Sequence, residues 1–212
     1  ADAMLGLLTP VIKGYGTDKG FDTAVNMQQV FGGHGYIEEW GMSQFVRDAR
    51  IAMIYEGANG IQALDLVGRK LPANNGRAIM AYFKEVGDFC EENREDEALS
   101  FFTKHLKKGL NELQASTMWL MQNAMKNPDN AGAASTDYMH LFGVVALGYM
   151  WAQMAKIATQ KLAEGADEKE FYEDKLLLAR FYMERIMPET LTRRQRIEAG
   201  SETMMSMQAA SF

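Results

Sequence analysis

The sequence predicts an all-α protein, a helical bundle followed by a second helical bundle, and three observations support this. Apolar residues recur at intervals of three and four over residues 101–121 and again over 176–186, and this spacing lines one face of a helix. The sequence offers no clear run of alternating β-branched residues bounded by turns, which would indicate a strand. Only four prolines interrupt the 212 residues.

The individual helices follow from the residues that start and stop them. Gly and Pro end helices, whereas Ser, Thr, Asp and Asn begin them. Helices are expected over residues 2–15, 18–31, 42–50, 57–71, 76–92, 97–126, 134–164, 168–187 and 189–198. Polar residues that can cap or begin helices lie near three of these starts: Thr17 and Asp18, Thr136 and Asp137, and Asp167. Gly165 suits the C-terminal end of the helix over 134–164.

The break LPANNGR, residues 71–77, separates two parts of the chain. We expect a Gly-rich first domain over residues 1–72 and a longer helical domain over residues 77–212. The acidic run 91–97 is most simply a solvated loop between helices. The 16 methionines are expected to fill irregular contacts in the core.

Composition and charge disfavour several classes of protein. The 22 Lys and Arg against 28 Asp and Glu give a net charge of −6, which argues against nucleic-acid binding. The one cysteine, Cys90, forms no intramolecular disulfide and is expected to be a buried thiol, so a reducing compartment, the cytoplasm, is expected. No second His or Cys stands at ligand spacing from His105 or His140, so no metal site is expected.

The longest apolar run, residues 141–152, is shorter than the about twenty residues that a bilayer requires. We interpret it as a core helix and expect no membrane span. The N-terminus lacks the basic start of a signal peptide and opens without Met, so the chain is interpreted as part of something longer.

One segment, residues 28–62, differs from the rest in its glycines and polar residues. Gly32, Gly33 and Gly35 follow an apolar helix, where they either form a helix end and turn or let the backbone approach a ligand closely. His34 between them is expected to be a hydrogen-bonded filler.

The same segment contains Ile54-Tyr55-Glu56-Gly57. A carboxylate at the edge of an apolar pocket is partly desolvated, and this makes it a better proton acceptor. The alternative is a carboxylate favoured by the dipole at a helix N-terminus. Local sequence does not decide between these interpretations.

The motifs QVFGGHGY, VRDAR, IYEG and GIQALDLVGRKL, in this order, closely resemble the C-terminal helical domain of the acyl-CoA dehydrogenases over about residues 2–72. The segments LGYMWAQMAKIA and KLLLARFYMERIMPE resemble the extra C-terminal helical domain of a long subgroup that includes the 3-methylmercaptopropionyl-CoA dehydrogenases. The chain is thus similar to roughly the last third of such an enzyme.

The resemblance implies oxidation of an acyl-CoA thioester to the trans-2-enoyl-CoA, a reaction of fatty acid metabolism in which FAD accepts the hydride. Glu56 matches the base that removes the α-proton, and its backbone N–H is expected to bind the thioester oxygen. Tyr55 and Gly57 beside it are expected to contact the substrate. The isolated chain is expected to be inactive, because the resemblance leaves out the domains that complete the site.

The resemblance also implies the cofactor contacts. The stretch Gln29, Val30, Phe31, Gly32 and Gly33 matches the part of the family that approaches the FAD of a neighbouring subunit.

The chain departs from the family just after the base. Where the family commonly has Thr, this chain has Ala58, so Asn59 is expected to offer an amide to the flavin instead of a hydroxyl. Arg47 and Asp48 match a family element that we interpret as an internal ion pair or cap, with Arg50 as a further partner.

The expected partners are an acyl-CoA substrate, an electron-transferring flavoprotein and further copies of the chain in a homo-oligomer. The second domain, with its patch of Arg193, Arg194 and Arg196, is expected to pack against a neighbouring subunit. The alternatives are that it covers the active site or contacts the CoA phosphates. Two other interpretations of the whole chain stay open: a non-catalytic flavoprotein relative, and a stand-alone helical interaction module.

Overall fold

The computed structural model describes residues 2–211, and no strand occurs among them. The all-α prediction is confirmed. The α-helices are α1 (Asp2–Val30), α2 (Gly33–Tyr36), α3 (Met42–Ala52), α4 (Asn59–Asp65), α5 (Arg77–Glu92), α6 (Ser100–Asn123), α7 (Pro128–Ala163), α8 (Lys169–Phe181), α9 (Glu189–Glu198) and α10 (Glu202–Met205). Two π-helical segments, Leu66–Lys70 and Tyr182–Ile186, continue α4 and α8, and short 3-10 turns cover Glu38–Trp40, Ala73–Gly76 and Ala209–Ser211.

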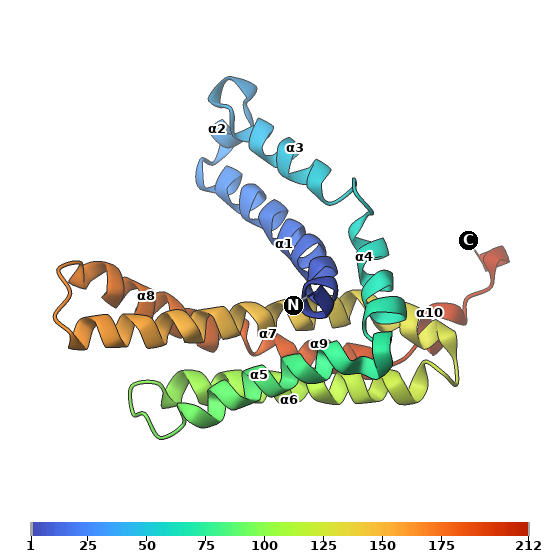
Figure 1. The fold of residues 1–212 in the computed structure, drawn as a ribbon. Coiled ribbons are helices and arrows are strands. Elements are labelled where there is room, and N and C mark those ends of the chain that lie inside the picture. Colours follow the sequence, from blue (N-terminus) through green and yellow to red (C-terminus); the bar gives the residue numbers. More distant parts are fainter. Residues whose placement is uncertain (1, 212) are drawn as a thin grey trace.

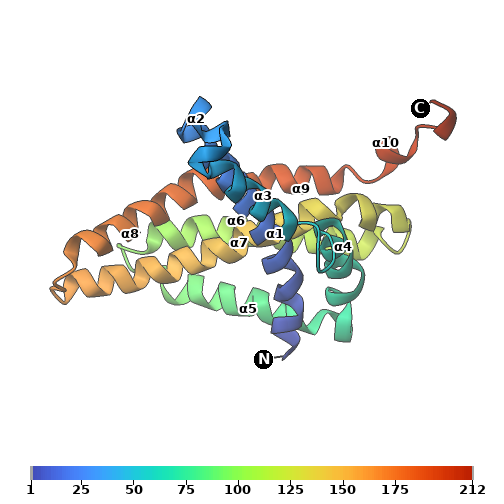
Figure 2. The same ribbon diagram turned by 90° about the horizontal axis from the view of Figure 1, so that it is seen from above.

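Helix α7 is the centre of an elongated bundle (Figure 1). It packs against α6, α8 and α9, and also against α1 and α4 from the first part of the chain. Helices α1 and α3 form a hairpin that projects from this bundle, and Figure 2 shows the hairpin lying across it. Buried residues from both parts belong to one core cluster, from Leu7 on α1 to Ile197 on α9.

Helix α7 is long and apolar enough, by length and composition alone, to cross a membrane. In this fold residues 138–145 are all buried, because neighbouring helices cover the middle of α7. The structure therefore places the apolar run in the core, as the sequence suggests. The helix begins at Pro128, with Asn127 Oδ1 accepting the backbone N–H of Asp129, so the expected start near Thr136 and Asp137 is wrong.

Helix α1 is continuous, and the expected break at residues 16–17 is wrong. Thr17 does not cap a helix. Its hydroxyl donates to the carbonyl of Lys13 within α1, over 2.7 Å. Gly14 is buried where α1 meets α7. The two helices approach so closely there that a Cβ on Gly14 would stand 2.3 Å from Sδ of Met139. Packing against α7 therefore keeps this segment helical although its glycines have low helix propensity.

Two other predictions about helix ends differ in outcome. Asp167 makes no cap, since Glu168 occupies that position and offers no side-chain hydrogen bond. Gly165 has φ +75° just after the end of α7, as expected of a C-terminal glycine.

The chain turns at residues 73–76, where Asn74, Asn75 and Gly76 have positive φ. The division into domains at this turn stays a prediction.

Candidate functional site

The loop between α3 and α4, residues 53–58, holds Glu56 in an unusual backbone conformation. Glu56 has φ +54° and Gly57 has φ +82°, so both are left-handed. This φ favours glycine at position 57, and a Cβ there would also stand 2.8 Å from Nε2, the mobile end of the Gln62 side chain. Left-handed backbone costs a residue with a side chain roughly 1–3 kcal/mol.

The strain at Glu56 is distinctive among the described residues. Only two other non-glycine residues there have positive φ, and both are asparagines, Asn74 and Asn75. Asparagine tolerates this conformation because its short side chain can bond locally, whereas glutamate has no such advantage. Backbone strain of this kind concentrates at functional sites.

Two side chains hold the loop from either side. Lys13 on α1 donates from Nζ to the carbonyl of Gly57 over 2.7 Å, and Gln62 on α4 donates from Nε2 to the carbonyl of Glu56 over 3.1 Å. Within residues 2–211, by contrast, no group accepts a hydrogen bond from the backbone N–H of Glu56 or Gly57. The carbonyls of Glu56 and Gly57 are thus hydrogen-bonded within the chain, whereas their two backbone N–H groups are available to a ligand.

The carboxylate of Glu56 is exposed, and so are the flanking Ile54 and Tyr55. The desolvation expected at the edge of an apolar pocket is therefore not provided by the described residues. The alternative, a carboxylate in the first turn of a helix, does not hold either. Helix α4 begins at Asn59 with Ala58 as its N-cap, so Glu56 lies two residues before the cap.

Asn59 anchors this loop to α1. Its Nδ2 donates to Asp18 Oδ1 over 2.6 Å, to Thr17 Oγ1 over 2.9 Å and to the carbonyl of Gly14 over 3.1 Å. Its Oδ1 accepts from Lys13 Nζ over 2.7 Å. Both ends of the amide are engaged within the chain, so a flavin contact, which stays a prediction, would require an exchange of these bonds.

The sequence does not predict that Asp18 and His140 take part in anchoring this loop. Asp18, interpreted as a helix cap, instead accepts from Nε2 of His140 on α7 over 2.7 Å. Burial by itself would raise the pKa of Asp18, but hydrogen bonds from His140 and Asn59 lower it below its ordinary value. The signal in the sequence was a polar stretch at residues 17–19 inside an otherwise long helix.

The Gly-rich loop lies at the outer tip of the hairpin, and the Glu56 loop at the other end of α3 (Figure 1). Gly32 has φ +59° and ψ −143°, a region open essentially to glycine alone. A Cβ on Gly35 would stand 2.2 Å from the carbonyl oxygen of Gln28. These two glycines therefore have the structural role that the simpler interpretation offered.

Gly33 is different. Its φ is not positive, and the space around an ideal Cβ is open. Gln29 beside it is exposed, as are Val30 and Phe31, at 74% and 53%. An exposed amide next to an open, side-chain-free backbone segment fits close approach by a planar cofactor such as a flavin.

The hairpin exposes large apolar side chains along most of its length. They include Val30, Phe31, Tyr36, Ile37, Trp40, Phe45, Ile51, Ile54 and Tyr55. An apolar surface of this extent is typical of an interface.

The remaining candidates on the hairpin have other roles. Arg47 and Asp48 lie inside α3 and form neither a cap nor an ion pair among the described residues. Asp48 accepts from Gln44 Nε2 over 2.7 Å, and Arg50 lies over the ring of Phe21 at 5.6 Å. His34 is exposed and contacts the Trp40 ring edge to face.

The second part of the chain uses most of its conspicuous groups internally. Arg193 pairs with Asp137 and Glu189, and Arg194 with Glu112 and Glu198. Acidic partners neutralise Arg193 and Arg194, so these two arginines are poorly suited to binding the CoA phosphates. Separately, burial raises the pKa of the Cys90 thiol to about 11.

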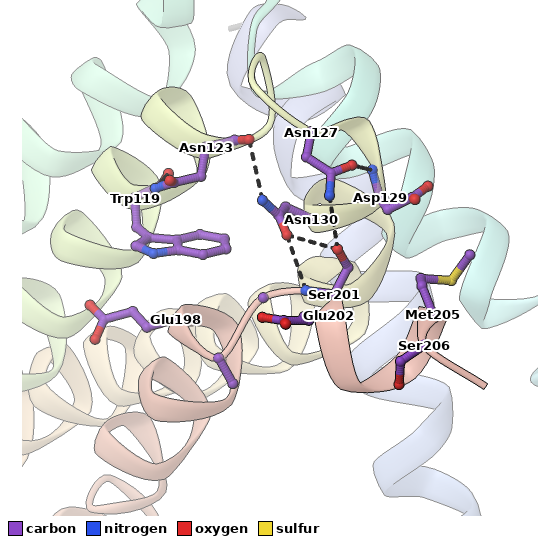
Figure 3. A pocket seen from close by; sticks show the side chains of 12 residues that line it. Trp119, Asn123, Asn127, Asp129, Asn130, Glu198, Ser201, Glu202, Met205 and Ser206 are labelled. Atoms are coloured by element: carbon purple, nitrogen blue, oxygen red, sulfur yellow. Dashed lines mark hydrogen bonds between the residues drawn. The ribbon is translucent and has the colours of Figure 1, made fainter.

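A polar hollow of about 670 Å³ lies near the start of α7. Figure 3 shows the side chains that line it. Asn130 Oδ1 accepts from both the backbone N–H and the hydroxyl of Ser201, over 3.0 and 2.9 Å, and Asn127 Nδ2 donates to the same hydroxyl. These bonds fasten the segment after α9 to α7. The described residues contain no group of three or more His, Cys, Asp or Glu side chains that could hold a metal ion.

Two family models match the chain, one on each side of the turn at residues 73–76. A family model described as "Acyl-CoA dehydrogenase, C-terminal domain" matches residues 1–71, and one described as "Acetyl-CoA dehydrogenase C-terminal like" matches residues 82–208. A 3-methylmercaptopropionyl-CoA dehydrogenase from Ruegeria pomeroyi is 31% identical over 97% of this chain and 35% of its own length.

Two further relatives are similar over nearly the whole chain. A broad-specificity linear acyl-CoA dehydrogenase from Mycobacterium tuberculosis is 28% identical over 97% of this chain and 35% of its own. A butyryl-CoA dehydrogenase from Syntrophomonas wolfei is 27% identical over 94% of this chain and 33% of its own. The chain spans about a third of the length of these curated relatives.

Proposed function

The chain belongs to the acyl-CoA dehydrogenase family, and on this premise we propose that it acts as the C-terminal part of an FAD-dependent enzyme that oxidises an acyl-CoA thioester to the trans-2-enoyl-CoA. The carboxylate of Glu56 takes the α-proton, the hydrogen on the β-carbon leaves with its electron pair, and a Cα=Cβ double bond forms. The substrate thereby loses two electrons and two hydrogens.

The observation that carries this proposal is the strained backbone of Glu56. A glutamate held at φ +54° by Lys13 and Gln62 keeps its carboxylate and its own N–H on one short loop. A base must meet one hydrogen of its substrate in a fixed geometry, and a rigid loop supplies that geometry at low entropic cost during the reaction.

The free backbone N–H of Glu56 is proposed to bind the thioester oxygen. A donor at this place strengthens its hydrogen bond as negative charge develops on the oxygen during α-proton removal. Tyr55 and Gly57 then border the same acyl group, with the exposed Tyr55 ring as an apolar wall. This arrangement acidifies the α-carbon beside the base that deprotonates it.

The flavin is proposed to lie against residues 29–33, where Gln29 offers an amide, and Val30 and Phe31 an apolar surface. Gly32 and Gly33 leave room for close backbone approach. When bound, the flavin would serve as the hydride acceptor. Since these residues and Glu56 lie at opposite ends of α3, a flavin at the tip belongs to the site of another subunit, and the exposed apolar hairpin supports a homo-oligomer.

Two expectations complete the proposal. Electrons pass from the reduced flavin to an electron-transferring flavoprotein, and the enzyme works in the cytoplasm, as a chain with one buried cysteine permits. The chain alone is inactive, because its Glu56 carboxylate is exposed to water in the absence of further structure around it.

The test is an anaerobic titration of the longer, flavin-containing enzyme with short-chain and long-chain acyl-CoAs while the flavin absorbance is followed. The flavin absorbance of the unmodified enzyme should decrease. Glu56→Gln should keep the flavin and lose bleaching, because the amide has nearly the same shape and cannot accept the α-proton. Glu92→Gln, an exposed carboxylate at the end of α5, is the matched control and should bleach normally.

Other outcomes lead to other functions. Bound flavin that no thioester bleaches would contradict the proposal and favour the non-catalytic flavoprotein relative. A compact, flavin-free monomer for the isolated chain, together with no flavin in any longer form, would favour the helical interaction module.

A further inference from the structure

A chain of hydrogen bonds runs from the core of the second part to the Glu56 loop. His140 on α7 contacts Asp18 on α1 over 2.7 Å, and Asp18 accepts from Asn59 over 2.6 Å through its other oxygen. We propose that His140, Asp18 and Asn59 are positioning residues, through which the second helical part fixes the loop that carries the base. This inference rests on the proposed role of Glu56.

The first link is directional. Because the pKa of Asp18 is lowered, its carboxylate is ionised at neutral pH and only accepts hydrogen bonds, so Nε2–H of His140 must be the donor. The carboxylate thus uses one oxygen for α7 and the other for the residue that begins α4. A single side chain on α1 therefore aligns two elements that are far apart in the sequence.

The second link reaches the loop itself. Lys13 Nζ donates both to Asn59 Oδ1 and to the carbonyl of Gly57, each over 2.7 Å. Gly57 directly follows the base, so displacement of Asn59 moves the peptide next to Glu56. The backbone N–H of Asn59 also donates to the carbonyl of Met53, which closes the loop from residue 53 to residue 59.

His140 has features that a simple packing residue would not need. It is 8% exposed, and its Nδ1 is buried without a hydrogen-bond partner among the described residues. An apolar side chain of similar size would avoid that unsatisfied atom. The imidazole is held edge to face against Tyr15, at 5.3 Å between ring centroids, and this leaves Nε2 aimed at Asp18. Its evident use is therefore the bond to Asp18.

The experiment measures the rate of flavin reduction by acyl-CoA in a single turnover, with substrate affinity measured separately. In the flavin-loaded enzyme His140→Ala should slow reduction about ten-fold or more, since small displacements of a reacting group carry large rate penalties. Substrate affinity should change less than about two-fold, because none of these residues is proposed to touch substrate. His140→Gln, which can still donate to Asp18, should restore most of the rate.

A second readout does not depend on activity. Hydrogen exchange of the amides of Asn59, Ile61 and Gln62, which bond to Met53 and Ala58, should accelerate in His140→Ala. Amides in the middle of α6 should not change. His105→Ala is the control, because His105 bonds only to the carbonyl of Phe101 in its own helix.

Should His140→Ala fail to fold, Lys13→Met tests the other end of the relay without disturbing the core. It should also slow reduction and accelerate exchange at Asn59. Unchanged reduction and unchanged exchange in both variants would overturn the inference while leaving the role of Glu56 intact. If the unmodified enzyme reduces no flavin, the proposed function fails, and the exchange measurement still decides whether His140 fixes the loop.

Discussion

The ring of Tyr15 on α1 lies so close to Gly143 on α7 that a Cβ on Gly143 would stand 2.3 Å from the ring carbon Cγ and 2.8 Å from Cβ of Tyr15. At the same crossing Gly14 faces Met139, with a Cβ at 2.3 Å from Sδ. These two glycines allow α1 and α7 to approach closely, and the contact between Asp18 and His140 depends on that approach.

Gly143→Ala should lower the free energy of unfolding by about 1–3 kcal/mol, because the rigid base of the Tyr15 side chain cannot move aside. Gly14→Ala should have a much smaller effect, since it meets only the flexible end of Met139 and gains helix propensity of about 1 kcal/mol. Urea unfolding of both variants checks this. Equal losses would show that the crossing is not set by the Tyr15 ring.

Glu56→Gly should make the protein more stable and inactive. Glycine adopts φ +54° without steric cost, and after the larger entropy of its unfolded chain is subtracted, a gain of roughly 0.5–1 kcal/mol remains. Thermal or urea unfolding measures the gain. Asn74→Gly is the matched control and should gain less, because asparagine already tolerates this backbone. A loss of stability in Glu56→Gly would contradict the strain argument.

Gly35→Ala and Gly33→Ala should separate folding from cofactor binding within one loop. A Cβ on Gly35 collides with the carbonyl of Gln28, so this variant should lose about 1–3 kcal/mol of stability. Gly33→Ala meets open space and should fold normally, yet bind FAD about ten-fold more weakly. Flavin fluorescence titration and unfolding measure the two effects. Unchanged FAD affinity in Gly33→Ala would remove residues 32–33 from the flavin site.

Asp18 should contribute to the acid sensitivity of the fold. Its pKa is lower in the folded protein than its ordinary value of 3.8, so its stabilising effect is complete above pH 3.8 and is lost as pH falls through the folded pKa. Asp18→Asn should therefore be less stable at pH 7, with a deficit that shrinks below pH 3.8. Urea unfolding from pH 7 to pH 3 tests this.

The prediction from sequence succeeded where local signals and packing agree. The long apolar helix α7 and the turn at Asn74 to Gly76 were both predicted. The start of α7 differs from the predicted one because Asn127 caps the helix and Pro128 fits its first position, so that Thr136 and Asp137 lie inside it.

The differences within α1 and around Glu56 arise from contacts between distant residues. The segment 14–18 contains glycines and capping residues, which predict a break, but α7 packs against Gly14 and His140 engages Asp18. Similarly, the local motif points to Glu56, which stays a prediction, but it does not predict the contacts of Lys13, Asn59 and His140 that support its loop. Periodicity and spacing carry no information about a partner 122 residues away.

That separation has a consequence for the order of events during synthesis. Ribosomes add roughly 5–20 residues per second, so His140 emerges about 6–24 s after Asp18. Throughout this interval the face of α1 that is buried in the complete chain, with Leu7, Val11 and Tyr15, lacks α7 as a packing partner. The rate of translation over residues 19–140 therefore sets how long this face of α1 remains uncovered on the ribosome.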